Sequence, residues 1–189
     1  MSLRELKEEI ERYEPYNEQE KQDRELMLEY IDSFSNVLTR DNRFGHFTAS
    51  AWVLNKQKTK VLMVYHNIYK SWVWTGGHSD GESDLLKVAI RELKEETGVK
   101  NVVVIKDDIF SLEVFAVRGH TKGDKYIPSH AHLNLTYLLE ADEDELLHIK
   151  EDENSGVKWV RIEDVKEVTD EGRWNRTYKK IDEKLRRFL

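Results

Sequence analysis

The first 38 residues carry apolar side chains at helical spacing. Apolar residues recur every three or four positions over 3–13, and the same spacing returns over 17–38 after a polar first stretch. Pro15 lies between the two segments and would interrupt a single continuous helix. The pattern therefore predicts two helices, and we expect them to form a helical arm over residues 1–44.

From residue 47 the apolar period changes to two, which is typical of strands. The segments with this pattern are 48–54, 60–65, 72–74, 102–105, 109–117, 132–139 and 157–162. Residues 55–59 suit a hairpin turn, and residues 118–129, with two glycines and a proline, are predicted to form a long hairpin loop.

Helical spacing returns twice within residues 45–189. One helix is predicted over 84–97, where Gly98 is the usual residue just past a helix end, and a last helix runs from about Glu171 to Phe188. Strands around one central helix, followed by a terminal helix, predict an α+β domain built as an α/β/α sandwich.

Composition narrows the class of protein. The 189 residues include no cysteine, which excludes a disulfide scaffold, a zinc–thiolate site and a cysteine nucleophile, and which fits a reducing compartment. No stretch approaches the roughly 18 to 20 continuous apolar residues of a membrane span. The first residues also lack the layout of a signal peptide. We therefore expect a cytoplasmic protein that does not enter a membrane.

The net charge of −7 is unevenly distributed. Residues 1–41 carry 12 acids and 6 bases, and residues 140–153 carry 8 acids and 1 base. The intervening residues 42–139 carry 10 acids and 13 bases. The acidic total argues against generic nucleic-acid binding. The mildly basic middle is compatible with a small phosphorylated ligand, and the acidic segment 140–153 would suit a divalent cation.

Acidic residues occupy an unusual place on the helix predicted over 84–97. Lys87 and Lys94 point away from the apolar stripe, whereas Glu92, Glu95 and Glu96 lie at its margin. A glutamate pair four residues apart on an exposed helix repels by about 0.2–0.5 kcal/mol, and burial increases this cost.

Pairing within the same helix can relieve only part of this repulsion. Arg91 can pair with Glu95, which leaves Glu92 and Glu96 without a cation from their own helix. An amphipathic helix with an acidic margin is one interpretation. The glycine-rich loop that enters the helix favours the other, in which the carboxylates hold a hard divalent ion such as Mg²⁺.

Residues 77–99 resemble the Nudix box. Arg91-Glu92-Leu93-Lys94-Glu95-Glu96-Thr97-Gly98-Val99 matches the second half of that motif at every fixed position, and Gly77 supplies its opening glycine. One position departs, because the box has a glutamate where this chain has Ser83, with Glu82 one residue early. We expect the change to affect the residues that orient the arginine, and Ser83 to be able to cap the helix instead.

The resemblance implies a fold and an activity. It covers about residues 45–165 and implies the mixed sheet of the Nudix fold. Nudix enzymes hydrolyse the pyrophosphate of a nucleoside diphosphate linked to another moiety, with Mg²⁺ or Mn²⁺. The partner implied is a small nucleotide derivative.

The resemblance also implies residue roles. Glu92 and Glu96 would be metal ligands, and Glu95 would be a ligand or the base that acts on the attacking water. Arg91 would hold the glutamates in place. The substrate-binding residues implied are Gly76, Gly77 and His78, with a carbonyl of the glycine pair available to the metal.

Outside the box, several residues are candidates with a simpler alternative. Glu153 lies six residues before Trp159, as in a pattern that recurs in the family, and would be catalytic; otherwise it belongs to a solvated acidic loop. His130 and His132 alternate on one strand face and could bind metal or phosphate, or form an ordinary polar pair. Asp80, like His78, lies in the loop expected to border the substrate.

Two further groups could contact a nucleotide. The aromatic side chains that could stack on a base, or pack in the core instead, are Phe47, Trp72, Trp74 and Tyr126. The basic residues of the predicted hairpin loop that could meet phosphates, or stay solvated, are Arg118, Lys122 and Lys125.

Alternative functions remain on the same fold. A non-catalytic nucleotide-binding module would normally have lost box glutamates, which are all present here. A prenyl diphosphate isomerase would in its best-known form need a cysteine, and an RNA-end processing enzyme fits the acidic arm poorly. The arm could pack on the domain, pair with a second copy as a homodimer, or bind another partner.

Overall fold

The protein, seen here as a computed structural model, is described over residues 1–169 and 175–189. The helices are α1 (Leu3–Arg12), α2 (Glu18–Ser33), α3 (Leu85–Thr97), α4 (Val165–Val168) and α5 (Asn175–Phe188), with a 3-10 turn, η1 (Ile162–Asp164). The strands are β1 (Gly45–Leu54), β2 (Lys60–His66), β3 (Ser71–Val73), β4 (Thr75–His78), β5 (Val102–Val117), β6 (His120–Lys122), β7 (Lys125–Ile127), β8 (His130–Ala141) and β9 (Asn154–Arg161).

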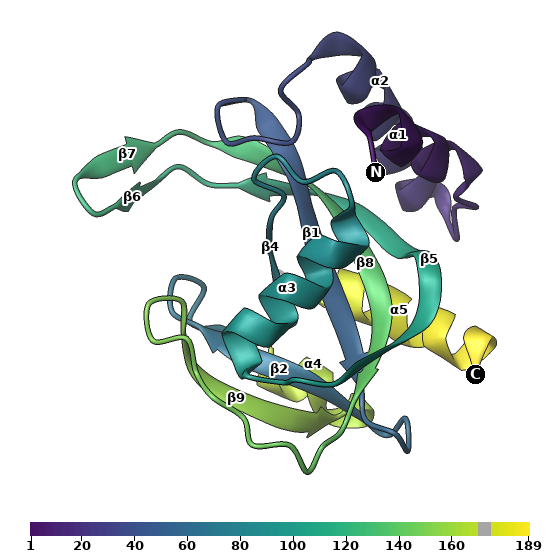
Figure 1. Cartoon of the computed structure of the whole chain (residues 1–189), viewed down its shortest axis with the longest axis vertical. Helices are drawn as coiled ribbons and strands as arrows, with labels where there is room; N and C mark the ends of the chain where they lie inside the picture. The colour runs from purple at the N-terminus through teal and green to yellow at the C-terminus, as the bar shows by residue number, and fades with distance from the viewer. Residues whose placement is uncertain (170–174) are drawn as a thin grey trace.

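A seven-stranded mixed sheet forms the centre of the molecule (Figure 1). Its main order is β3-β2-β1-β8-β5, with β4 paired to β1 and β9 paired to β2. Strands β1 and β8 are parallel, whereas the other pairs of this sheet are antiparallel. The mixed α+β architecture predicted from the sequence is confirmed.

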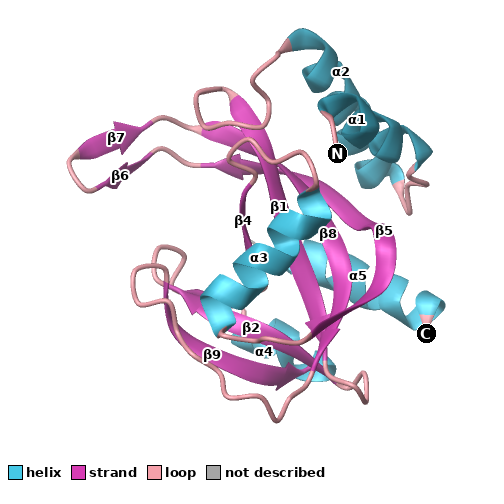
Figure 2. Ribbon diagram, in the orientation of Figure 1, coloured by secondary structure: helices cyan, strands magenta, loops and turns pink. Residues whose placement is uncertain are grey.

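Helices cover both faces of this sheet (Figure 2). On one face, α1, α2 and α3 pack over a core that includes Phe47, Leu93 and Leu133. On the other face, α4 and α5 pack over a second core that includes Trp52 and Ile181. The alternation of side chains along β1 separates the two cores, which gives the α/β/α sandwich that the sequence predicts.

Some element boundaries differ from the predicted ones. Helix α2 ends at Ser33, five residues early, because Phe34 turns into an extended conformation. The strands expected at 102–105 and 109–117 are one strand, β5, whose register against β8 shifts in between. The long loop expected at 118–129 contains the hairpin β6–β7, which projects beyond the body in Figure 1. The predicted start of the last helix near Glu171 lies outside the described residues.

The N-terminal helices pack on the domain. Leu6, Ile10 and Met27 are fully buried in the same core as the sheet. Helix α2 also covers β5, which lies at the end of the strand order: Asp23 Oδ2 accepts a hydrogen bond of 2.9 Å from the Val114 backbone N–H. An edge strand whose backbone is bonded in this way is protected from pairing with another chain.

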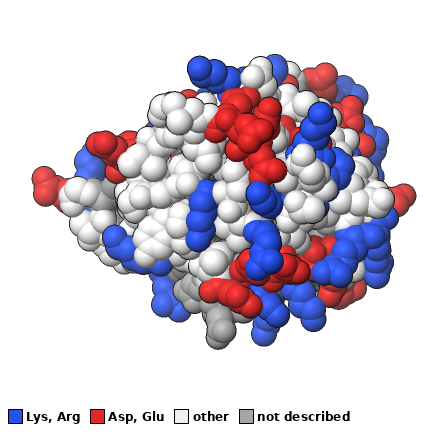
Figure 3. All heavy atoms as spheres, turned by 90° about the horizontal axis from the view of Figure 1, so that it is seen from below, with Lys and Arg blue, Asp and Glu red and all other residues white. Residues whose placement is uncertain are grey.

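The surface carries charges of both signs. Figure 3 shows acidic and basic side chains interspersed on one face of the molecule. Two lysines near the β1–β2 turn pair with acids at the end of β8 and just after it: Lys58 lies 3.1 Å from Glu140, and Lys60 lies 2.5 Å from Glu143. Among the described helices, none is both long and apolar enough to cross a membrane.

Candidate active site

Helix α3 has its own start and stop signals. Asp84 is the N-cap, and its carboxylate accepts a hydrogen bond from the Lys87 backbone N–H. Gly98 ends the helix with φ of 77°, a conformation that favours glycine. The prediction that Ser83 caps the helix is wrong: its hydroxyl instead donates to the Met1 carbonyl, because the N-terminus lies beside this loop.

The carboxylates of α3 lie against strand β4. The backbone N–H of Gly76 donates to Glu96 Oε2 at 3.1 Å. A Cβ atom on Gly77 would come within 2.4 Å of the Glu92 carboxyl carbon, so only glycine allows this approach. Both carboxylates are consequently enclosed, with Glu92 9% and Glu96 3% exposed.

Arg91 joins the helix to β4. Its guanidinium donates to Glu92 Oε1 at 2.8 Å and to the His78 carbonyl at 3.0 Å. Glu95 is a more distant partner, 3.9 Å from Nε. The expected pair of Arg91 with Glu95 is therefore longer than the pair with Glu92. The guanidinium points toward β4, where it donates to the His78 carbonyl, and this orientation brings it next to Glu92.

A second cation, Lys150, joins the helix to the acidic segment. Its ammonium nitrogen lies 3.2 Å from Glu95 Oε2 and 3.1 Å from Glu153 Oε1. Asn154 holds this segment in place by donating to the Glu96 carbonyl at 3.0 Å. Lys150 is not among the site residues predicted from the sequence, although it is the one base within residues 140–153.

The acidic segment divides into two parts. Glu140 and Glu143 pair with lysines of the β1–β2 turn, and Glu145 accepts hydrogen bonds from the backbone of residues 100 and 101. Glu153, in contrast, lies with Lys150 beside the α3 carboxylates. Only the end of the acidic segment, with Glu153, therefore lies at the α3 carboxylates, and Glu140, Glu143 and Glu145 pair elsewhere.

Burial raises the pKa of both enclosed glutamates. For Glu92, Arg91 partly opposes this effect. The pKa of Glu96 lies well above its usual value because desolvation outweighs its hydrogen bond from Gly76. Buried carboxylates with too little positive charge beside them are suited to a hard divalent cation such as Mg²⁺, which takes oxygen ligands. Glu92, Glu95, Glu96 and Glu153 supply such oxygens, so the residues present fit the ion.

Four histidines gather on the neighbouring part of the sheet. His46 on β1 is the register partner of His132 on β8, and the rings of His78 and His130 lie 5.0 Å from that of His132. Burial, followed by neighbouring histidines, lowers the pKa of His132 to about 2 and that of His78 to about 4. His46 is not among the site residues predicted from the sequence, because its place in this group follows only from the pairing of β1 with β8.

The carboxylates and histidines line one cavity of about 1220 Å³. Among the aromatic candidates, Trp74 and Tyr126 line the cavity, whereas Phe47 is fully buried in the core. The remaining one, Trp72, packs edge-on against Tyr65.

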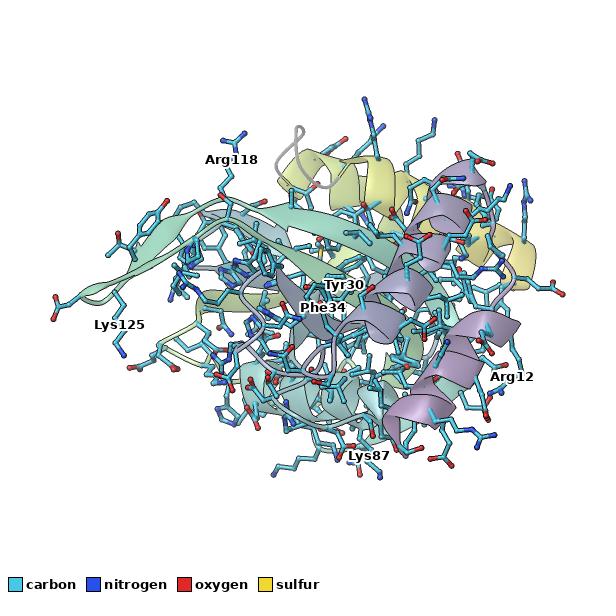
Figure 4. The ribbon with its side chains drawn as sticks, turned by 90° about the horizontal axis from the view of Figure 1, so that it is seen from above. Arg12, Tyr30, Phe34, Lys87, Arg118 and Lys125 are labelled. Atoms are coloured by element: carbon cyan, nitrogen blue, oxygen red, sulfur yellow. The ribbon has the colours of Figure 1, made fainter. Side chains whose placement is uncertain are left out.

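Basic residues border the same cavity. Arg118 and Lys125 contribute to its lining from the hairpin, where Figure 4 shows them leaving the ribbon in different directions. The side chain of Lys122 lies outside the described residues. Asp80 and Arg40 also line this cavity and form a two-point ion pair, at 2.8 and 2.9 Å.

Comparisons with known proteins agree with this geometry. The family model of the NUDIX domain matches residues 44–181. An RNA pyrophosphohydrolase from Pelagibacter ubique (strain HTCC1062) is 30% identical over 141 residues, which are 72% of this chain and 89% of the relative.

Solved structures share the fold. A Caenorhabditis elegans (C. elegans) Ap4A hydrolase binary complex has a TM-score of 0.56 at 19% identity, covering 76% of this chain and 96% of its own. A NUDIX family hydrolase from Clostridium perfringens has a TM-score of 0.51 at 22% identity, covering 72% and 96%.

Proposed function

The chain belongs to the Nudix family and is a pyrophosphohydrolase of that family, and from this premise we propose its reaction. We propose that it hydrolyses the pyrophosphate bond of a nucleoside diphosphate linked to another moiety, with Mg²⁺ or Mn²⁺. The observation that carries the proposal is the group of carboxylates on α3 and Glu153 that opens into the cavity beside the Gly76–Gly77 strand. The absence of cysteine supports a cytoplasmic setting for this reaction.

The buried glutamates are proposed to hold the metal. Glu92 and Glu96 are fixed by Arg91 and by the Gly76 N–H, so their oxygens need no reorganisation to receive a cation. A bound Mg²⁺ or Mn²⁺ would neutralise developing charge on the phosphate and orient the diphosphate. Arg91 is a positioning residue, since it contacts Glu92 and the His78 carbonyl.

The two more exposed carboxylates, those of Glu95 and Glu153, are called the outer carboxylates, and we propose that they take part in proton transfer. Glu95 and Glu153 both line the cavity and share the Lys150 ammonium. We propose that one of them accepts a proton from the attacking water, or that Glu95 acts as a third metal ligand. In-line attack at phosphorus needs mainly this positioning and charge.

A second substrate class is favoured by one comparison. The curated relative at 30% identity is named an RNA pyrophosphohydrolase, which places the 5′-pyrophosphate of an RNA among the candidates. The basic rim residues Arg118 and Lys125 could meet additional phosphates of such a chain. The overall charge of −7 favours the small nucleotide derivative.

One assay tests both classes. Dinucleoside polyphosphates, nucleotide sugars, oxidised nucleoside triphosphates and a 5′-triphosphate RNA are incubated with Mg²⁺ or Mn²⁺ and the wild-type chain. We expect turnover of one class and a loss of at least about 10²-fold in kcat for Glu96→Gln, because the substitution removes a charged ligand.

Glu163→Gln is the matched control. Glu163 lies on η1, and its side chain is 70% exposed and pairs with Arg161 at the end of β9, so the same loss of charge should leave activity unchanged. Turnover of no compound, or equal activity of wild type and Glu96→Gln, would overturn the proposal. A preference for the RNA would replace the small nucleotide by the second class.

A further inference from the structure

Three histidine rings bring nitrogen atoms together beside the glutamates. His46, His130 and His132 each offer a ring nitrogen, and these three atoms all lie within 4.8 Å of one another. The Nε2 atoms of His130 and His132 are 3.2 Å apart. In a tetrahedral zinc site with Zn–N bonds of about 2.0–2.1 Å, two nitrogens lie roughly 3.3 Å apart, so this spacing already suits a shared metal.

The contacts of two rings with backbone carbonyls place the ring hydrogen on Nδ1. His46 Nδ1 lies 3.4 Å from the Asn42 carbonyl, and His130 Nδ1 lies 2.9 Å from the Pro128 carbonyl. A carbonyl only accepts, so each Nδ1 carries the hydrogen, and Nε2 of the neutral ring keeps its lone pair. Metal-binding histidines commonly use a backbone carbonyl in this way.

His46 supplies the second indication. It is 4% exposed, and its Nε2 atom is buried without a hydrogen-bond partner among the described residues. A buried ring nitrogen without a partner is costly unless something binds it. The neighbouring rings of His130 and His132 lie 5.1 Å from the His46 ring, centre to centre, and one ring nitrogen of each histidine lies within 4.8 Å of the others.

We propose that His46, His130 and His132 bind one divalent transition-metal ion, with Zn²⁺ the best fit, at the wall of the substrate cavity. Three imidazoles suit Zn²⁺ and related ions, whereas the glutamate oxygens on α3 suit Mg²⁺ or Mn²⁺, so the two sites select different metals. Three protein ligands leave a fourth position for water or a ligand oxygen, and all three histidines line the cavity.

The two sites are joined by His78. Its ring lies 5.0 Å from those of His46 and His132, and its carbonyl accepts the hydrogen bond from Arg91. An ion at the histidines would therefore stand at the same cavity wall as the carboxylates without sharing their ligands.

Metal binding without substrate tests the proposal independently of hydrolysis. The full chain, freed of metal, is titrated with Co²⁺ while visible absorption is recorded, and Zn²⁺ is then added as competitor. We expect one equivalent of Co²⁺ with nitrogen-ligand absorption, displacement by Zn²⁺, and a Zn²⁺-dependent rise in the thermal midpoint. His46→Gln and His132→Gln should each weaken Zn²⁺ binding by at least about 100-fold.

Two variants distinguish binding at the histidines from binding at the carboxylates or at a surface histidine. Glu96→Gln should retain Co²⁺ binding while losing hydrolysis, and His148→Gln, which changes an exposed histidine outside the cluster, should behave as wild type. If His46→Gln does not fold, His130→Gln, at a partly buried position, gives the same test. Wild type that binds no Co²⁺, or binding that Glu96→Gln removes and the histidine variants keep, would overturn the proposal.

Discussion

The carboxylate of Glu20 lies 2.9 Å from the ammonium nitrogen of Lys180, although 160 residues separate them in the chain. Neither side chain is more than 5% exposed. Lys180 also lies 2.7 Å from Glu113, and Lys184 lies 2.8 Å from Glu20. Two acids and two bases therefore form a buried neutral network that links α2, β5 and α5.

Removing one member of this network should be costly. In Lys180→Met, the carboxylates of Glu20 and Glu113 stay buried and Glu113 loses its lysine, so we expect a loss of about 3–5 kcal/mol in the free energy of unfolding. Urea denaturation measures the change. Lys179→Met is the control, because Lys179 is 79% exposed and 3.9 Å from Glu183, and it should cost less than about 1 kcal/mol. Equal losses in the two variants would contradict a buried network.

The same network explains what the sequence could and could not predict. The α3 carboxylates follow from local signals, since glycine, helical spacing and the box motif lie within 23 consecutive residues. Glu20, in contrast, lies in the polar first stretch of α2, where no apolar spacing in the sequence predicts burial. It is fully buried because α5, from the far end of the chain, supplies its partners.

The candidate site divides in a similar way. Glu92 and Glu96 could be placed beside the buried stripe from helical spacing alone. His46 and Lys150 could not, because one depends on the parallel pairing of β1 with β8 and the other on how the segment after β8 folds back on α3. Residues that meet only through tertiary structure leave no periodic signal in the chain.

A pH dependence should arise where the arm meets the sheet. Burial raises the pKa of Glu9 to about 7 from 4.5, although the hydrogen bond of 3.3 Å that the Tyr137 hydroxyl donates to its carboxylate opposes this rise. The pKa of Glu9 is higher in the folded protein than in the unfolded chain. The stability that its protonated carboxyl contributes is therefore present in full below pH 4.5 and is lost as the pH rises through 7. The loss is at most about 3 kcal/mol.

Glu9→Gln should remove this dependence. Glutamine stays neutral, so we expect the variant to match wild type near pH 4.5 and to exceed its free energy of unfolding at pH 8. Urea denaturation across that range measures both. Glu8→Gln, whose side chain on the same helix is 43% exposed, should keep the wild-type slope, and parallel curves for Glu9→Gln and wild type would contradict the raised pKa.

The contact between Gly77 and Glu92 gives a test of carboxylate placement. In Gly77→Ala the new methyl group would meet the Glu92 carboxylate at 2.4–2.7 Å and push it from its position. A displacement of about 1 Å can lower a rate 10²-fold, so we expect kcat to fall by about that factor and Mn²⁺ affinity to fall with it.

Gly123→Ala is the matched control for this change. An added Cβ there meets nothing within 4 Å, although φ of 59° makes the substitution slightly strained. Hydrolysis rates and Mn²⁺ titrations of the two variants should therefore differ. Full activity of Gly77→Ala would show that Glu92 has room to move without consequence.

Lys150 should compete with the metal for the outer carboxylates. Its ammonium lies within about 3.2 Å of both Glu95 and Glu153 and its side chain is 26% exposed, so it supplies positive charge that a divalent ion would otherwise provide. Lys150→Met removes the repulsion between this ammonium and a bound metal ion. If that repulsion is on the order of 1 kcal/mol, the half-saturating concentration of Mn²⁺ should be several-fold lower in the variant. The KM for an anionic substrate should rise at the same time, because the cavity loses a cation.

Lys94→Met removes the same charge from the solvent-facing side of α3 and should change neither quantity. A higher half-saturating concentration in Lys150→Met would instead mean that the lysine holds Glu95 and Glu153 in their metal-binding positions.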